Sequence, residues 1–308
     1  MAIRLRSGTI DDVETFTRLV NAQHQWLRGE DLWEAEELSS ILISPSSDPV
    51  RYDRYIDVDG VAVAGLHTHV SAPFNRATIH LASPPGELRM EYASQLIEAS
   101  LRILRSRPEV PPEATVQIDV AQEDIELARL LIASGFIHSD DVVVLEADIS
   151  DTRPAVWPVG ISGRTLEPAT DLDLSFNVMS VSFMPEPGGW HVTKEDFLYM
   201  LNKDPTALPG LSVMAVRDDK PAGIAMNFVD TTRAETGLVG MLGVMPELRG
   251  HGIGKALLLE SFSQFREQGW SSSRLATITG HRARDLQFFQ SVGLKPIYVN
   301  QVYLRPVH

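Results

Sequence analysis

The spacing of apolar residues changes abruptly within the C-terminal half of the chain. Residues 236–244 (TGLVGMLGV) are apolar and glycine-spaced, which predicts a buried strand. From residue 253 to 266 the apolar positions recur at helical spacing, with Glu260 and Gln264 on the opposite face. The pattern therefore predicts a strand, a short glycine-rich loop and a helix in direct succession.

The same order of strands and helices is predicted twice along the chain. In the first half, strands are expected at 3–6, 52–58, 61–70, 75–82, 115–120 and 142–147, helices at 11–20, 91–105 and 125–133, and mixed helix and loop over 22–50. In the second half, strands are expected at 161–166, 211–216, 220–229, 236–244, 274–279 and 294–305, and helices at 168–182, 194–202, 254–266 and 283–290. Asp59-Gly60 and Asp218-Asp219 mark hairpin turns.

A repeat of about 155 residues implies two copies of one fold rather than two unrelated domains. Residues 151–160, with Pro154 and Pro158, are typical of a linker. We therefore expect domains at 1–150 and 161–308, joined by this linker.

Three glycines, Gly250, Gly252 and Gly254, separate the predicted strand from the helix. Such a loop leaves backbone N–H groups free at a helix N-terminus, which favours a phosphate-bearing anion. The spacing Gly-x-Gly-x-Gly does not fit a dinucleotide fingerprint, and no acidic residue follows at the required distance. A nucleoside-triphosphate loop is also excluded, because Lys255 is followed by Ala256 rather than Ser or Thr.

The net charge and the amino-acid composition exclude several kinds of binding partner and site. The 308 residues carry a net charge of −14, which argues against nucleic acid and anionic membranes as partners. The first 150 residues hold 12 Arg, no Lys and 25 acidic residues, whereas the remainder holds 15 basic and 16 acidic residues. The nearly neutral second half therefore suits an anionic coenzyme better. The absence of cysteine excludes disulfides, thiolate zinc sites and a cysteine nucleophile.

Arg249, Gly252 and Gly254 together form the pattern Arg-x-x-Gly-x-Gly, which resembles the pyrophosphate loop of the GNAT superfamily of acyl-CoA N-acyltransferases. The resemblance implies an α/β (α+β, GNAT-type) fold, with two tandem copies of a mixed, mostly antiparallel sheet flanked by helices. It also implies acetyl-CoA as the co-substrate, and no metal. The residues implied to contact acetyl-CoA are Leu242, Gly243, Val244, Arg249, Gly250, His251, Gly252, Ile253, Gly254, Lys255 and Phe289.

The first half departs from this pattern at the corresponding place, residues 81–91 (LASPPGELRME). Pro84 and Pro85 remove backbone donors, two acids oppose a polyphosphate, and a single glycine remains. We expect this half to be a degenerate domain that does not bind CoA in the usual way.

A duplicated chain with a degenerate first half is similar to the mycothiol synthase-like group, which acetylates the free amine of a cysteinyl pseudo-disaccharide. Resemblance does not transfer the substrate. It implies an N-acetyltransferase that moves an acetyl group from acetyl-CoA directly to the primary amine of a small molecule, in a ternary complex. A non-catalytic acyl-CoA-binding or regulatory module and a structural dimerisation protein stay open as alternatives.

The family polarises its thioester with a backbone N–H on the strand before the loop, which implies a donor within 242–244. Glu235, at the start of that strand, is the first candidate for the general base. His191 is the second, because an imidazole titrates near neutral pH. Glu186 and Trp190, on the same predicted loop as His191, are expected to line the acceptor site.

Phe289 stands where many family members have a tyrosine that protonates the leaving thiolate. Phenylalanine has no proton to give. Water, Tyr298 or Tyr303 is left to supply the proton, or no acid is needed, since a thiol of pKa about 8.5 leaves acceptably unaided. We further expect a cytoplasmic protein, without a transmembrane segment, that is a monomer or a homodimer.

Overall fold

The computed structural model describes residues 2–71, 75–108, 110–111, 113–183, 192–278 and 283–308. The chain divides into two compact units, Met1–Val142 with Val299–His308, and Val143–Tyr298. These units differ from the predicted domains 1–150 and 161–308, because residues 299–308 lie in the first unit and 143–150 in the second. The boundaries of the sequence repeat stay a prediction. Among the described helices, none has the length and apolar character needed to cross a membrane.

The first unit is built on strands in the order β1-β2-β3-β4-β5-β12. The parallel pair is β4 with β5, whereas β1–β2, β2–β3, β3–β4 and β5–β12 are antiparallel. Its elements are β1 (Ile3–Ser7), η1 (Ile10–Asp12), α1 (Val13–Arg28), α2 (Ala35–Leu42), α3 (Pro49–Tyr52), β2 (Arg54–Val58), β3 (Val61–Ser71), β4 (Arg76–Ala82), α4 (Arg89–Arg105), β5 (Thr115–Ala121), α5 (Ile125–Ala133), the start of β6 (Ile137–Asp148) and most of β12 (Lys295–Pro306).

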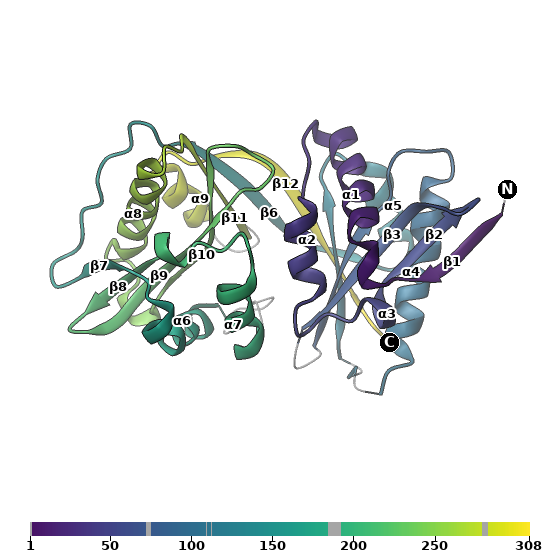
Figure 1. Ribbon diagram of the computed structural model, residues 1–308, viewed down its shortest axis with the longest axis horizontal. Helices are drawn as coiled ribbons and strands as arrows, with labels where there is room; N and C mark the ends of the chain where they lie inside the picture. Colours follow the sequence, from purple (N-terminus) through teal and green to yellow (C-terminus); the bar gives the residue numbers. More distant parts are fainter. Residues whose placement is uncertain (1, 72–74, 109, 112, 184–191, 279–282) are drawn as a thin grey trace. The chain divides into compact units, whose positions relative to one another are not determined.

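Helices cover both faces of this first sheet (Figure 1). On one face, Leu96 and Leu101 of α4 and Leu127 of α5 join the buried side chains of β2–β5. On the other face, Phe16 and Leu38 come from α1 and α2. The alternation of side chains along each strand, with period two, supplies an apolar row to each layer.

The second unit continues with strands in the order β6-β11-β10-β9-β8-β7. The pair β10–β11 is parallel, whereas β7–β8, β8–β9 and β9–β10 are antiparallel. Its further elements are β7 (Ser162–Thr165), α6 (Pro168–Phe183), α7 (Lys194–Lys203), η2 (Pro209–Leu211), β8 (Val213–Arg217), β9 (Lys220–Val229), β10 (Thr236–Val244), η3 (Pro246–Leu248), α8 (Ile253–Glu267), β11 (Ser272–Ile278) and α9 (Ala283–Gln290).

Glycines allow α8 to pack directly on the second sheet. A Cβ added to Gly237 of β10 would lie 2.4 Å from the Phe265 ring, and one added to Gly223 of β9 would lie 3.1 Å from Leu257. The opposite face is covered by α6 and α7, through Val178 and other buried residues. Helix α8 is therefore fixed against the strand that precedes it, as the change of apolar period predicted.

Both predicted hairpin turns are present. Asp59 and Gly60 have φ of 50° and 86°, and Asp218 and Asp219 have φ of 48° and 61°. Two successive residues with positive φ are the signature of a type I′ turn, which matches the twist of the flanking strands.

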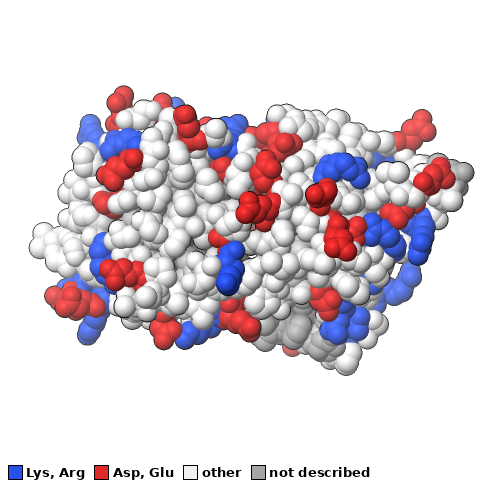
Figure 2. All heavy atoms as spheres, in the orientation of Figure 1, with Lys and Arg blue, Asp and Glu red and all other residues white. Residues whose placement is uncertain are grey.

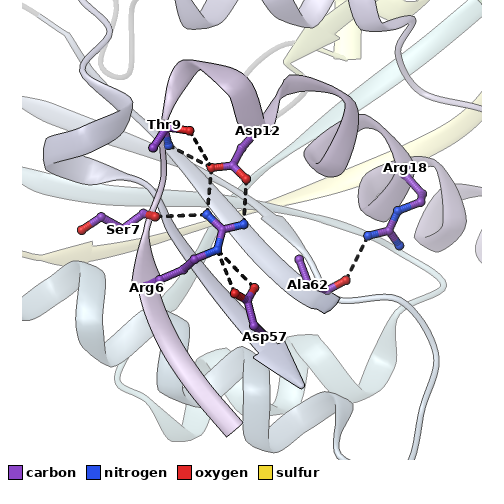
Figure 3. Close-up of polar contacts among 7 residues, drawn as sticks. All are labelled: Arg6, Ser7, Thr9, Asp12, Arg18, Asp57 and Ala62. Carbon is purple, nitrogen blue, oxygen red and sulfur yellow. Dashed lines mark hydrogen bonds and ion pairs between the residues drawn. The ribbon is translucent and has the colours of Figure 1, made fainter. Parts of the chain in front are cut away.

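A strand-to-helix clamp fixes the start of the first unit (Figure 3). Arg6 of β1 donates from both terminal nitrogens to the Asp12 carboxylate, over 2.8 and 2.7 Å. The same guanidinium donates to the Ser7 carbonyl over 3.1 Å, and the Thr9 N–H donates to Asp12 over 2.9 Å. Asp57 of β2 accepts from Arg6 Nε at 3.0 Å.

The second unit repeats this clamp. Arg164 of β7 donates from both terminal nitrogens to Asp171 of α6, over 2.5 and 2.7 Å. It also donates to the Thr165 carbonyl over 3.1 Å, while the Glu167 N–H donates to Asp171 over 2.9 Å. In each unit, four equivalent bonds thus join the first strand to the start of the helical segment that follows it, which supports the predicted duplication.

Candidate coenzyme site

Strands β10 and β11 pair over only part of their length. The parallel register joins Thr236, Gly237 and Leu238 to residues 272–274, although β10 continues to Val244. Within the described residues, the pairing of β10 with β11 ends at Leu238, and residues 239–244 have no partner on β11.

A β-bulge at Gly240 accompanies the separation. The register between β10 and β9 shifts between Val239 and Met241 and leaves Gly240 without a partner on β9. A Cβ at Gly240 would lie 2.6 Å from the Phe228 ring, so this position requires glycine. Bulges bend the strand that carries them, and here the bend coincides with the end of the β11 pairing.

The bulge also determines which backbone groups face the open edge. Met245 N–H donates to the Ala222 carbonyl of β9 over 3.0 Å. Because successive N–H groups along a strand point in opposite directions, the N–H groups of Met241 and Gly243 also face β9. The N–H groups of Leu242 and Val244 therefore face the opposite edge of β10, where the pairing with β11 has ended. This arrangement supports the predicted donor within residues 242–244 and favours Leu242.

The loop after β10 leads into the N-terminus of α8 through two left-handed glycines. Gly250 and Gly252 have φ of 81° and 87°, which L side chains adopt with strain. Gly252 is the N-cap of α8, and no side chain caps this helix end. The N–H groups of Ile253, Gly254 and Lys255 have no partner within the helix, and the helix dipole adds positive potential there. This geometry suits a phosphate anion.

Arg249, predicted to contact the coenzyme, bonds to backbone carbonyls. Its Nε donates to Val244 O over 3.2 Å and its Nη2 donates to Ser182 O over 3.0 Å. Ser182 Oγ also donates to Val244 O, over 3.2 Å. The side chain of Arg249 therefore joins the loop to the end of α6.

Three further residues shape the site and were not predicted from the sequence. Ser182 lies 3.0 Å from a Cβ built on Gly243, Phe288 of α9 lies 3.4 Å from one built on Gly254, and Pro158 lies 3.9 Å from one built on Gly252. Glycine spacing alone could not identify these neighbours, since each comes from a segment distant in the sequence.

The candidate base Glu235 lies at the other end of β10. It is exposed, has φ of 56°, and its carbonyl accepts from Ser271 and Ser272 N–H groups. Seven residues separate it from Leu242, which at about 3.3 Å per residue amounts to roughly 23 Å. The role of Glu235 stays a prediction, and this distance weighs against direct proton transfer.

Glu186, Trp190 and His191 lie outside the described residues. Phe289 is buried in α9 and packs against Phe288, with ring centroids 5.0 Å apart. Tyr303, an alternative acid, lies in the first unit, where its hydroxyl is 3.2 Å from Gln301 Oε1. The candidates for acid and base therefore stay predictions.

The corresponding place in the first unit is filled by the chain itself. Ser83, after β4, receives a hydrogen bond on its carbonyl from Arg89 Nε and gives its N–H to Gln23 Oε1, each over 2.6 Å. Arg89, the first residue of α4, is buried and also pairs with Asp124. The segment 83–88 also contains Pro84 and Pro85 and has no residue with positive φ, which supports the expected degeneracy.

Charged side chains do not separate by sign on the face that Figure 2 shows, where acidic and basic groups are interspersed. This favours a role of the acidic excess in solubility. Within the described ranges, no group of three or more His, Asp or Glu side chains is placed to hold a metal ion.

Comparison with known proteins is consistent with this geometry. Residues 178–294 match the model of the acetyltransferase (GNAT) family. Two solved structures match the fold over the whole chain: a GCN5-related N-acetyltransferase from Sphaerobacter thermophilus (20% identity, TM-score 0.81, 99% of this chain and 96% of the other) and a tandem GNAT protein from the clavulanic acid biosynthesis pathway (16% identity, TM-score 0.74, 100% and 99%). The whole chain therefore has the fold of a tandem GNAT protein.

A curated relative is more similar in sequence than these two structures are. A mycothiol acetyltransferase from Thermomonospora curvata is 27% identical over 252 residues, which cover 80% of each chain. The predicted GNAT fold, tandem mycothiol synthase-like arrangement and acetyl-CoA-dependent N-acetyltransferase activity are confirmed by these comparisons. The non-catalytic alternative is not favoured.

Proposed function

We propose that the loop 249–255 and the open edge of β10 bind acetyl-CoA, and that the acetyl group passes directly to the primary amine of a small molecule. The observation that carries this proposal is the junction of two features. Gly250 and Gly252 adopt left-handed φ at the N-terminus of α8, and β10, whose pairing with β11 ends at Leu238 within the described residues, lies directly before them. The pyrophosphate would bind at α8 and the pantetheine arm along β10.

In this arrangement the Leu242 N–H would donate to the thioester oxygen as it gains negative charge. A preorganised donor of this kind contributes about 10²–10³ in rate. The amine attacks the carbonyl carbon, the C–S bond breaks, and CoA leaves as a thiolate. The curated relatives are named mycothiol acetyltransferases, so the cysteinyl pseudo-disaccharide amine is the first acceptor to test, beside a panel of simple amines.

Calorimetry with acetyl-CoA tests the coenzyme site. Wild type should bind one molecule per chain, because the equivalent segment 83–88 of the first unit contains two prolines and no residue with positive φ. Gly252→Asp should abolish binding, since it adds a negative charge at the N-terminus of α8.

Gly269 provides a matched control for this variant. It has φ of 84°, nearly the value of Gly252, but follows the other end of α8. Gly269→Asp should therefore bind acetyl-CoA as wild type does. Unchanged affinity in Gly252→Asp would reject the proposed site, and two molecules bound per chain would reject the degeneracy of the first unit. Release of free thiol over the amine panel then identifies the acceptor.

A further inference from the structure

An arginine braces the end of the central strand in each unit. In the second unit, Arg249 Nε donates to Val244 O, the last carbonyl of β10, while its Nη2 donates to Ser182 O near the end of α6. In the first unit, Arg89 Nε donates to Ser83 O, directly after β4. Each arginine lies five or six residues beyond the carbonyl that it binds.

A side chain of the first long helix reaches the same backbone segment in both units. Gln23 of α1 accepts from Ser83 N–H over 2.6 Å, and Ser182 of α6 donates to Val244 O over 3.2 Å. The residue types differ, but strand end, arginine and first helix are joined in each case. The brace is therefore a property of the repeated fold.

The two units differ in what surrounds the brace. In the first unit, the segment 83–88 between β4 and α4 has no residue with positive φ, and Arg89 is buried against Asp124 and stacked over the Trp26 ring at 4.8 Å. The arginine contact is thus kept where the glycine loop is lost. If the arginine served only to bind coenzyme phosphate, its bond to the strand-end carbonyl would not be needed in the first unit.

We propose that Arg249 is a positioning residue that holds the end of β10 against α6, and so fixes the backbone donor of Leu242, instead of acting as a phosphate ligand. The inference rests on the proposed coenzyme site. The bonds from Arg249 to the Val244 and Ser182 carbonyls keep the end of β10 and the loop in a fixed position. A displacement of about 1 Å at such a site lowers the rate about 10²-fold.

Two measurements on Arg249→Met separate the two roles. The first is the melting temperature without ligand, which should fall by a few degrees because the Val244 and Ser182 carbonyls each lose one donor. The second is kcat/KM with acetyl-CoA and with S-acetylpantetheine, which has the same thioester and no pyrophosphate. Positioning predicts a loss of about 10-fold or more with both donors. An unchanged melting temperature, or a loss confined to acetyl-CoA, would overturn the inference.

Three comparison variants sharpen this test. Arg249→Lys retains one donor and should recover part of the loss in kcat with S-acetylpantetheine. Ser182→Ala removes the other bond to Val244 O and should lower kcat with both donors in the same direction as Arg249→Met. Lys255 is an exposed cation in the first turn of α8. Lys255→Met should therefore lower kcat/KM with acetyl-CoA and leave kcat/KM with S-acetylpantetheine unchanged. If wild type failed to bind acetyl-CoA, the proposed function would fall, while the melting temperatures would still decide the role of Arg249.

Discussion

Asp171 at the start of α6 accepts hydrogen bonds from both terminal nitrogens of Arg164 in β7. These bonds, despite the opposing effect of burial, lower the pKa of Asp171 below its usual value. The carboxylate is therefore better stabilised in the folded protein than in the unfolded chain. Its contribution is present above pH about 4 and is lost as the pH falls through the lowered pKa.

Asp171→Asn should destabilise the protein by about 1–3 kcal/mol at pH 7, because the charged pair is lost while Arg164 stays in place. The measurement is the free energy of unfolding in urea at pH 7 and pH 3. The difference between variant and wild type should shrink at pH 3. A difference of equal size at pH 7 and pH 3 would show that the Asp171 charge does not contribute as described. Asp173, an exposed residue of the same helix, provides the control variant Asp173→Asn.

Histidines should make the first unit sensitive to mild acid. Burial, together with His67 and His69, lowers the pKa of His80 to about 3, and burial with nearby Arg28 lowers that of His24 to about 4. Between these values and pH about 6.5 the unfolded chain binds more protons, so stability falls as the pH falls. At pH 5, each histidine should lower the free energy of unfolding by about 1–2 kcal/mol.

The dependence can be measured by urea unfolding at pH 7.5 and pH 5. The double variant His24→Gln/His80→Gln should show a smaller difference between the two pH values than wild type does. His308→Gln, at an exposed position, should keep the wild-type difference. An equal pH dependence in all three proteins would show that the loss has another origin.

Gly243→Ala should impair catalysis by separating α6 from β10. Its Cβ would lie 3.0 Å from Ser182 Oγ and 3.1 Å from Ser182 Cβ, closer than these atoms tolerate without movement. We expect kcat to fall by about 10-fold, because the donor strand shifts. Ser182→Gly in the same chain removes both contacts and should restore part of the rate, as measured in a double-mutant cycle. Strictly additive effects would mean that the two residues do not interact.

Glu235→Gln should leave kcat within about twofold of wild type, since Glu235 lies roughly 23 Å along β10 from Leu242. The check is the pH dependence of kcat with acetyl-CoA and a saturating amine. Loss of the acidic limb, where kcat rises with pH as the base is deprotonated, would restore Glu235 as the general base.

The sequence predicted most elements of this fold because apolar period, glycines and turn residues act locally. The β10–loop–α8 unit, for example, follows from residues 236–266 alone. The strand that completes the first sheet could not be predicted in this way. Residues 300–306 pair with 115–121, and this pairing depends on contacts between segments almost 200 residues apart.

The coenzyme loop was recognisable because glycines at fixed spacing determine backbone conformation directly. The contacts of Arg249 could not be recognised from the sequence, because nothing in its sequence context distinguishes a phosphate ligand from a donor to Ser182 O. Glu235 was chosen for its place at a strand start; the structure keeps the predicted strand bounds, 236–244, and so places Glu235 at the far end of β10 from Leu242.

The pairing of β12 with β5 has a consequence for synthesis. Residues 299–308 belong to the first unit, and Val307 is fully buried there, with its N–H donating to Ala114 O. While the ribosome is still translating the second unit, β5 therefore presents an unpaired edge to other chains. Domains commonly fold in order as they emerge, but here the unit of residues 1–142 is complete only after residues 299–308, which follow the second unit, have been translated. Expression of residues 1–150 alone should accordingly yield aggregated protein, and supplying residues 295–308 as a peptide should improve its solubility.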